Sequence, residues 1–158
     1  MQTPLLSHFV QQNPAMVDVS DKASTEREAV AMTTIKTPTW LTDQLNEGEL
    51  ASKKGPVFQT AILAGVMGAK RTSSLIPLCH AITSDHISVD ICIDGPGLIK
   101  VLCRVKSFGR TGVEMEALTG ASIAALTVYD MCKSLTFDME IGGTRLLKKT
   151  GGKNDRAT

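Results

Sequence analysis

Two stretches of alternating apolar and polar residues, joined by four turn-forming residues, constrain the fold of this chain more than any other feature. Residues 87–93 and 98–105 carry apolar side chains at every second position, and Asp94-Gly95-Pro96-Gly97 lies between them. A period of two places these apolar side chains on one face of a strand, and glycine and proline favour a reversal of the chain. The sequence therefore predicts a β-hairpin with one buried face.

Two long helices are predicted to pack against this hairpin. In residues 57–74 apolar and small residues recur at helical spacing, and Gly65, Gly68 and Ala69 permit close approach of a neighbouring element. Residues 112–135 are rich in alanine, leucine, methionine and glutamate and contain no proline, a composition that favours a helix.

Further strands are expected over residues 16–19, 29–35 and 139–149, where β-branched residues and partial alternation occur. A short polar helix is expected over 40–49. The main elements then follow the order βαββαβ, which is the split βαβ arrangement of ferredoxin-like domains. Such domains are α+β folds in which helices cover one face of an antiparallel sheet and leave the other face free.

The length of 158 residues suits one domain with a single core. We interpret residues 1–15 as a flexible N-terminal segment, residues 16–153 as the domain and residues 154–158 as a flexible C-terminal tail. The formal net charge of +1 gives no general attraction to nucleic acids or membranes. No secretory leader and no run of about eighteen apolar residues is present, so we expect a cytoplasmic protein.

Asp130 and Lys133 are the first candidates for acid/base chemistry. They stand three residues apart on the predicted helix 112–135, so both side chains lie on one face and can meet the same ligand. The spacing alone favours an ordinary surface ion pair, because such pairs are common. The apolar residues around them favour a wet margin or a pocket, where burial could shift both pKa values.

Glu114 and Glu116 place two carboxylates near the start of the same helix, where the helix dipole also favours negative charge. Fourteen residues separate Glu116 from Asp130, which is roughly 21 Å along a continuous helix. One small substrate could hardly touch both. Either the helix begins later than predicted, or neighbouring subunits contribute opposite ends to a site at their interface.

His80 follows Cys79 on a predicted loop, where an imidazole can bind a ligand or form a structural hydrogen bond. Adjacent loop residues point in different directions, so Cys79 and His80 do not predict a nucleophile and its base. The four cysteines form no CxxC pair, and no metal site is expected. Separate basic groups could together hold a polyphosphate: Lys53, Lys54, Lys70, Arg71, Lys148, Lys149 and Lys153.

Several strings are similar to those of the cyclic pyranopterin monophosphate synthase family: AKRT at 69–72, LIPLCH at 75–80, GRTGVEMEALT at 109–119 and YDMCK at 129–133. The resemblance extends over residues 16–153 and implies that they form a single catalytic domain. It implies a lyase of molybdenum cofactor biosynthesis that converts a cyclised dihydroguanosine triphosphate to cyclic pyranopterin monophosphate and pyrophosphate. It also implies a homohexamer, a trimer of dimers with active sites between subunits.

The same resemblance implies that Asp130 and Lys133 are the catalytic pair. It requires no cofactor, although Mg²⁺ could accompany the triphosphate. Ala81 replaces the proline usual in the family, so His80 would be held less rigidly. With the basic groups included, the expected substrate-binding residues are Leu78, Cys79, His80, Glu114, Met115, Glu116, Lys54, Lys70, Arg71, Lys149 and Lys153.

Two other classes of function fit the predicted fold. A ferredoxin-like sheet can serve as a non-catalytic nucleotide- or RNA-binding module, or its free face can serve an assembly protein. Aromatic residues make up only 4% of the chain, and the hairpin region offers little beyond Phe108 on which bases could stack. A scaffold leaves the charged candidates unexplained, so the sequence favours the enzyme.

Overall fold

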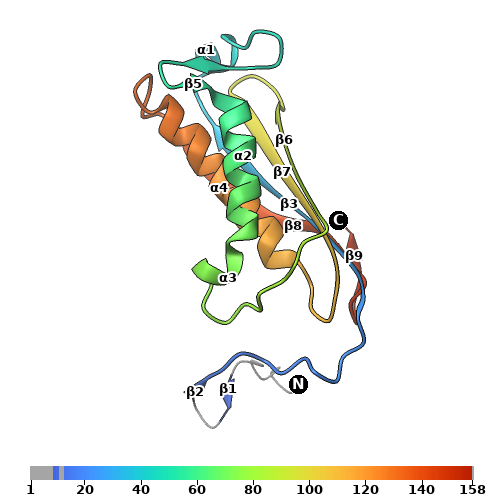
Figure 1. Ribbon diagram of the computed structural model, residues 1–158. Coiled ribbons are helices and arrows are strands. Elements are labelled where there is room, and N and C mark those ends of the chain that lie inside the picture. Colours follow the sequence, from blue (N-terminus) through green and yellow to red (C-terminus); the bar gives the residue numbers. More distant parts are fainter. Residues whose placement is uncertain (1–8, 11–12, 158) are drawn as a thin grey trace, which may run out of the picture.

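A computed structural model describes residues 9–10 and 13–157. Most of the chain forms two layers, an antiparallel sheet and a pair of helices that cross one of its faces (Figure 1). The strands of the sheet are β3 (Thr25–Lys36), β6 (His86–Ile93), β7 (Leu98–Gly109), β8 (Glu140–Thr150) and β9 (Arg156–Ala157), and the helices are α2 (Val57–Lys70) and α4 (Glu114–Cys132). The sheet order is β6-β7-β3-β8-β9. The predicted α+β class with an antiparallel sheet is confirmed.

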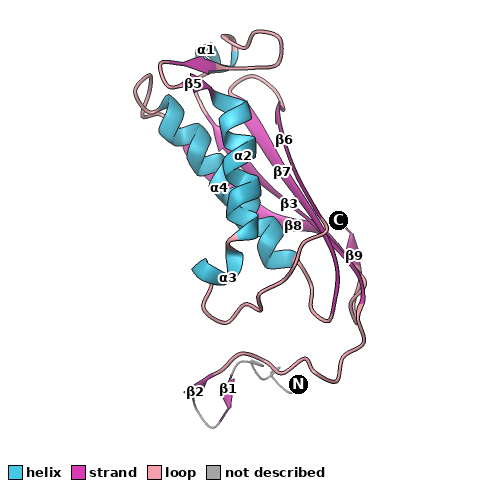
Figure 2. Cartoon of the chain, viewed as in Figure 1, coloured by secondary structure: helices cyan, strands magenta, loops and turns pink. Residues whose placement is uncertain are grey.

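Short elements lie outside the two layers. They are β1 (Phe9–Val10), β2 (Asn13–Pro14), α1 (Thr39–Thr42), β4 (Ala51–Ser52), β5 (Gly55–Pro56) and α3 (Thr72–Leu75). Of these, α1, β4, β5 and α3 belong to the connections between the longer elements, and β1 and β2 belong to the N-terminal segment, apart from the layers (Figure 2). No helix within residues 9–10 and 13–157 is long and apolar enough to cross a membrane.

The predicted hairpin is confirmed, because β6 pairs antiparallel with β7 from His86 opposite Lys106 to Ile93 opposite Ile99. Along β7 the side chains that face the helices are buried and alternate with more exposed ones, as the period of two requires. The turn depends on Gly97, whose φ is +67° and whose Cβ, if present, would overlap the carbonyl oxygen of Thr37. Glycine is the residue that fits there.

Helices α2 and α4 pack closely through small residues, as the sequence predicts. A Cβ at Gly68 would lie 2.7 Å from Ile123 on α4, and one at Gly65 would lie 2.9 Å from the backbone oxygen of Gly120. A Cβ at Gly120 would in turn lie 2.5 Å from the sulfur of Cys103 in the sheet. Side chains larger than hydrogen at these positions would push the layers apart.

Other boundaries differ from the prediction. Residues 16–19 form no strand. An alternating pattern is not sufficient for a strand, because the backbone also needs a neighbouring strand to pair with. The helix expected over 40–49 is limited to α1, and the bridge between Asn46 and Glu49 follows it. The helix expected over 57–74 divides into α2 and α3 at Arg71.

The two predicted flexible ends are described only in part. Residues 1–8, 11–12 and 158 lie outside the described residues. Within the expected C-terminal tail, β9 pairs with Lys148 and Lys149 of β8. The flexibility of residues 1–15 and 154–158 stays a prediction.

Candidate active site

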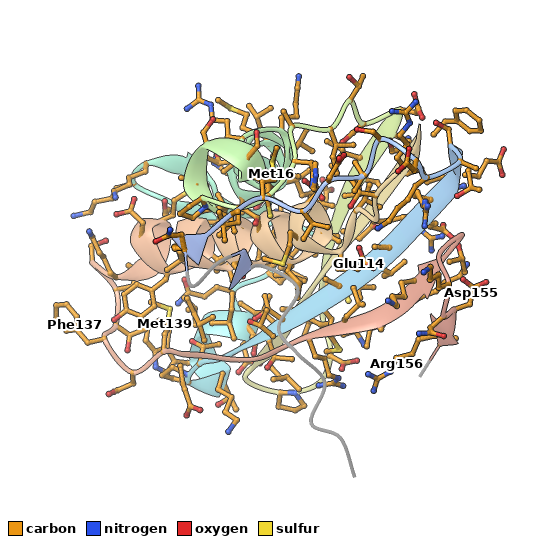
Figure 3. All side chains as sticks on the ribbon, turned by 90° about the horizontal axis from the view of Figure 1, so that it is seen from below. Met16, Glu114, Phe137, Met139, Asp155 and Arg156 are labelled. Carbon is orange, nitrogen blue, oxygen red and sulfur yellow. The ribbon has the colours of Figure 1, made fainter. Side chains whose placement is uncertain are left out.

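Helix α4 divides the predicted site residues into two groups. It runs without a break from Glu114 to Cys132, so the roughly 21 Å between Glu116 and Asp130 remains. Figure 3 shows Glu114 toward the end of the sheet that holds Asp155 and Arg156, with Phe137 and Met139 at the opposite end. A later start of the helix therefore does not resolve the separation.

The first group, here called the C-end triad, consists of Lys54, Asp130 and Lys133. The Asp130 carboxylate lies between the two ammonium groups, with Oδ2 2.6 Å from Lys54 Nζ and Oδ1 2.8 Å from Lys133 Nζ. Lys54 Nζ also donates a hydrogen bond of 3.0 Å to the backbone oxygen of Asp130. The hairpin β4–β5 thus joins the end of α4 through Lys54.

Ion pairing controls the charges of this triad. Hydrogen bonds from Lys133 and then Lys54 lower the pKa of Asp130 to about 2, and the bond with Asp130 raises the pKa of Lys133. The sequence predicts a pocket in which burial shifts these values. The side chains of Asp130 and Lys133 are each 52% exposed in the single chain. The ion pairs within the triad, and not burial, therefore shift the two pKa values.

The second group, here called the N-end cluster, surrounds two adjoining cavities at the start of α4. One cavity, of about 190 Å³, has more cations than carboxylates on its walls. The other, of about 270 Å³, contains Leu78, Cys79, His80, Met115 and Glu116. Glu114 lines both cavities, and Lys149 and Lys153 line the first. The cations of the first cavity, here called the cationic cavity, are Lys22, Arg27, Arg110, Lys149 and Lys153.

Several contacts hold Glu114 and the loop before it in the wall that the two cavities share. Lys149 Nζ lies 3.4 Å from Glu114 Oε1, which joins β8 to the first turn of α4. A Cβ at Gly112 would overlap the Glu114 carboxylate, so the absence of a side chain there lets the carboxylate fold back. Arg27 Nε donates to the backbone oxygen of Gly109, the last residue of β7, at 3.2 Å, and Arg27 Nη2 donates to that of Arg110, the first residue of the loop, at 3.4 Å.

Glu116 is the most deeply buried carboxylate of the N-end cluster. Its exposed fraction is 4%, and its Oε2 has no hydrogen-bond partner among residues 9–10 and 13–157. Burial first, and the charge of Glu114 second, raise the pKa of Glu116. Burial, helped by the charge of Glu116, also raises the pKa of the Cys79 thiol. A thiol that holds its proton is a weak nucleophile, which agrees with the low expectation of covalent catalysis.

The sequence left open whether the imidazole of His80 binds a ligand or forms a structural hydrogen bond. Its Nε2 lies 2.7 Å from the backbone oxygen of Val17, and the bond requires the ring proton on Nε2. The contact holds Val17 and Val19, which also line the second cavity, beside the loop of Cys79 and His80. His80 therefore makes a structural hydrogen bond and at the same time lines a cavity.

We expect Glu116→Gln to stabilise the isolated protein and to lower any activity that needs the charge. Removing a buried charge should raise the free energy of unfolding by about 1 kcal/mol at neutral pH. Glu116 has a raised pKa in the folded state, so the advantage of glutamine begins to decline as the pH falls through that pKa and is gone below the ordinary pKa of glutamate. Urea unfolding in neutral and mildly acidic buffer measures both effects.

Glu140→Gln provides the control, since the side chain of Glu140 is exposed and its carboxylate lies 3.8 Å from Lys36 Nζ. This substitution removes the same charge without relieving burial, so its effect on stability should be close to zero. A Glu116→Gln protein no more stable than the unmodified chain at neutral pH would contradict the prediction.

The remaining predicted residues lie apart from both groups. Lys70 lines a separate cavity with Asp85 and His86, and Arg71 is an exposed residue between α2 and α3. The cationic cavity also contains Lys22, Arg27 and Arg110, which were not among the basic groups expected to hold a polyphosphate. Arg27 stands in the charged first part of β3, before the predicted strand began.

The described residues contain neither a metal-binding cluster nor a disulfide. No group of three or more histidine, cysteine, aspartate or glutamate side chains is arranged to hold a metal ion in that part of the chain. The four cysteines are free, and burial raises the pKa of Cys103 to about 12 and that of Cys132 to about 11.

These features define an α+β protein with a cationic cavity and an Asp–Lys pair at opposite ends of one helix. Residues 16–152 match the MoaC family, and the chain belongs to that family. The family resemblance inferred from the sequence is confirmed.

Curated relatives cover nearly the whole chain. A cyclic pyranopterin monophosphate synthase from Xanthomonas campestris pv. campestris (strain B100) is 51% identical over 142 residues, 90% of this chain and 86% of the relative. A protein of the same name from Jannaschia sp. (strain CCS1) is 51% identical over 154 residues, 96% of this chain and 93% of the relative. Molybdenum cofactor biosynthesis protein 1 from Dictyostelium discoideum is 45% identical over 157 residues, 89% of this chain and 25% of that protein.

Proposed function

We propose that this chain is a cyclic pyranopterin monophosphate synthase, a lyase that converts a cyclised dihydroguanosine triphosphate to cyclic pyranopterin monophosphate and pyrophosphate. The observation that carries the proposal is the 51% identity, over 90% and 96% of this chain, to two relatives with that name. The cationic cavity and the Asp130–Lys133 pair support it, because a triphosphate needs cations and a rearrangement needs groups that move protons.

The fold that we propose for this function is ferredoxin-like. The longer elements occur in the order β3, α2, β6, β7, α4, β8, and the strands among them lie side by side as β6-β7-β3-β8. This order supports the split βαβ arrangement, since β7 lies between the two strands that α2 connects.

The triphosphate would bind in the cationic cavity. Lys22, Arg27 and Arg110 would join Lys149 and Lys153 as phosphate ligands, because multiple ammonium and guanidinium groups favour a polyanion. The neighbouring cavity, with His80 and Glu116, would hold the less charged part of the nucleotide. Binding by Lys70 and Arg71 stays a prediction, as does Mg²⁺ bound with the triphosphate; no resident cofactor is proposed.

Lys133 would act as the proton donor of the catalytic pair. A carboxylate with a pKa of about 2 remains ionised at neutral pH and accepts a proton only weakly. Lys133 is protonated at neutral pH in any case, so the role of Asp130 is to orient its ammonium group. An acid/base cycle then requires the substrate to disturb this ion pair, for example by placing a phosphate oxygen near Lys133.

The complete site would form between two copies of the chain. One copy would contribute the C-end triad and the other the N-end cluster, since α4 keeps these groups apart within a single chain. The exposed side chains of Leu63, Met67 and Leu126 on the helix layer support association. We propose a homohexamer, a trimer of dimers, located in the cytoplasm.

Direct incubation of the purified protein with cyclised dihydroguanosine triphosphate tests the function. We expect release of pyrophosphate together with a product of the mass of cyclic pyranopterin monophosphate, and no release from the linear nucleotide. Binding of RNA that weakens with salt, without any turnover, would favour the nucleotide- or RNA-binding module instead.

A further inference from the structure

Helix α2 begins without a capping side chain of its own. Its N-cap residue is Pro56, which makes no side-chain hydrogen bond to the helix. The first backbone N–H groups of a helix have no partner within the helix and must find acceptors elsewhere. Those acceptors lie in the preceding loop, which also carries Lys54 of the C-end triad.

Glu49 supplies most of these acceptors. Its Oε1 accepts hydrogen bonds of 2.7 Å from the backbone N–H groups of Phe58 and Leu50, and its Oε2 accepts one of 3.0 Å from Gln59. The N–H of Val57 donates to the Leu50 backbone oxygen at 2.8 Å. Burial disfavours the charge of Glu49, yet these backbone donors lower its pKa. An ionised carboxylate thus fastens the loop to the start of α2.

The same loop leads directly to Lys54. The hairpin β4–β5 begins two residues after Glu49, and Ser52 pairs with Gly55 across it. The Lys54 N–H donates to Ser52 Oγ at 3.1 Å, which sets the backbone at the hairpin tip. From there the Lys54 side chain reaches Asp130. A fixed anchor at Glu49 therefore limits where the Lys54 ammonium can lie.

We propose that Glu49 is a positioning residue for the C-end triad: by anchoring hairpin β4–β5 to α2, it holds Lys54 against Asp130. Its effect on catalysis rests on the proposed function, whereas its effect on the triad does not. The hydrogen bonds of the Glu49 carboxylate go to Leu50, Phe58 and Gln59, so Glu49 would act on Lys54 through the hairpin and not by direct contact.

A competing explanation is that Glu49 only stabilises α2. Helix capping alone predicts a lower thermal stability for Glu49→Ala but no change in Asp130 or Lys54 in the folded protein. Anchoring of Lys54 predicts changes in both, because Asp130 loses one of the two ammonium groups that lower its pKa. The two explanations thus differ in a quantity other than activity or stability.

The experiment compares Glu49→Ala and Glu49→Gln with the unmodified protein. Carbon NMR of labelled aspartate side chains measures the pKa of Asp130, which we expect to rise by about one unit in Glu49→Ala. At neutral pH, acylation of Lys54, followed by peptide mass spectrometry, should become several-fold faster as its ammonium leaves the carboxylate. Glu49→Gln retains one acceptor oxygen and should give intermediate values, and kcat should fall in the same order.

Asp85→Asn is the matched control. Its carboxylate also accepts a backbone N–H, from Phe108 at 2.7 Å, but it lies in the connection before β6, away from the C-end triad. It should destabilise the fold without altering the pKa of Asp130 or the acylation of Lys54.

Unchanged values for both Asp130 and Lys54 in a folded Glu49→Ala protein would overturn the proposal. If that variant does not fold, unchanged values in Glu49→Gln would overturn it equally. If the unmodified protein shows no turnover, the proposed function fails while the NMR and acylation results still decide the role of Glu49.

Discussion

Asp130→Asn and Lys133→Ala should each abolish turnover of the cyclised nucleotide while the chain stays folded and assembled. Asparagine keeps the shape of aspartate but not the charge that orients the Lys133 ammonium group, and alanine removes the proton donor. Loss of such a group costs roughly 10²- to 10⁴-fold in rate. Steady-state kinetics measures kcat, and circular dichroism and gel filtration report fold and assembly.

Lys36→Ala is the control for these two substitutions. It also breaks an exposed ion pair, between Lys36 and Glu140, and neither residue belongs to the C-end triad or the N-end cluster. Exposed ion pairs contribute little to stability, so all three variants should unfold at similar urea concentrations, and Lys36→Ala should retain full activity. Full activity in either site variant would remove that residue from the mechanism.

Two inactive variants should restore activity when they assemble together. One chain carries Asp130→Asn, and the other carries His80→Ala with Lys149→Ala, so each lacks a different end of the site. If neighbouring chains contribute opposite ends, every mixed dimer contains one site built from two intact halves. Random pairing of equal amounts makes half of the dimers mixed, and about a quarter of all sites should then be active.

The experiment requires that the chains exchange partners. Joint unfolding and refolding, followed by isolation of oligomers that carry two different affinity tags, would establish the mixture. Unmodified protein treated in the same way gives the reference activity, and each variant refolded alone gives the background. Activity at background in verified mixed oligomers would show that the two ends do not meet between these neighbours.

The sequence predicted the elements in which the spacing of apolar residues matches the face that is buried. The hairpin β6–β7 could be predicted because alternation, turn residues and proximity along the chain all agree. Strand β7 continues to Gly109, past the predicted end at residue 105, because its pairing with β3 extends to Thr25. Residues 16–19 show the converse: their alternation resembles a strand, but no strand among residues 9–10 and 13–157 pairs with them.

The candidate site could be predicted only where local spacing or family resemblance marked it. Asp130 and Lys133 meet because they stand three residues apart on a helix. Lys54 joins them through a hairpin that the sequence did not predict, and Arg27 enters the cationic cavity through the pairing of β3 with its neighbours. Such long-range placement depends on register, which a single sequence leaves open.

The glycine contacts between α2 and α4 limit how this protein can respond to a ligand. Gly65, Gly68 and Gly120 bring backbones and side chains into direct contact, so the two helices cannot slide past each other without collision. Adjustment during a reaction cycle is therefore expected in connecting segments, of which those near Val17, Lys54 and Cys79 border the two groups of site residues. Amide hydrogen exchange should accordingly be slowest along the facing surfaces of both helices and fastest in these three segments.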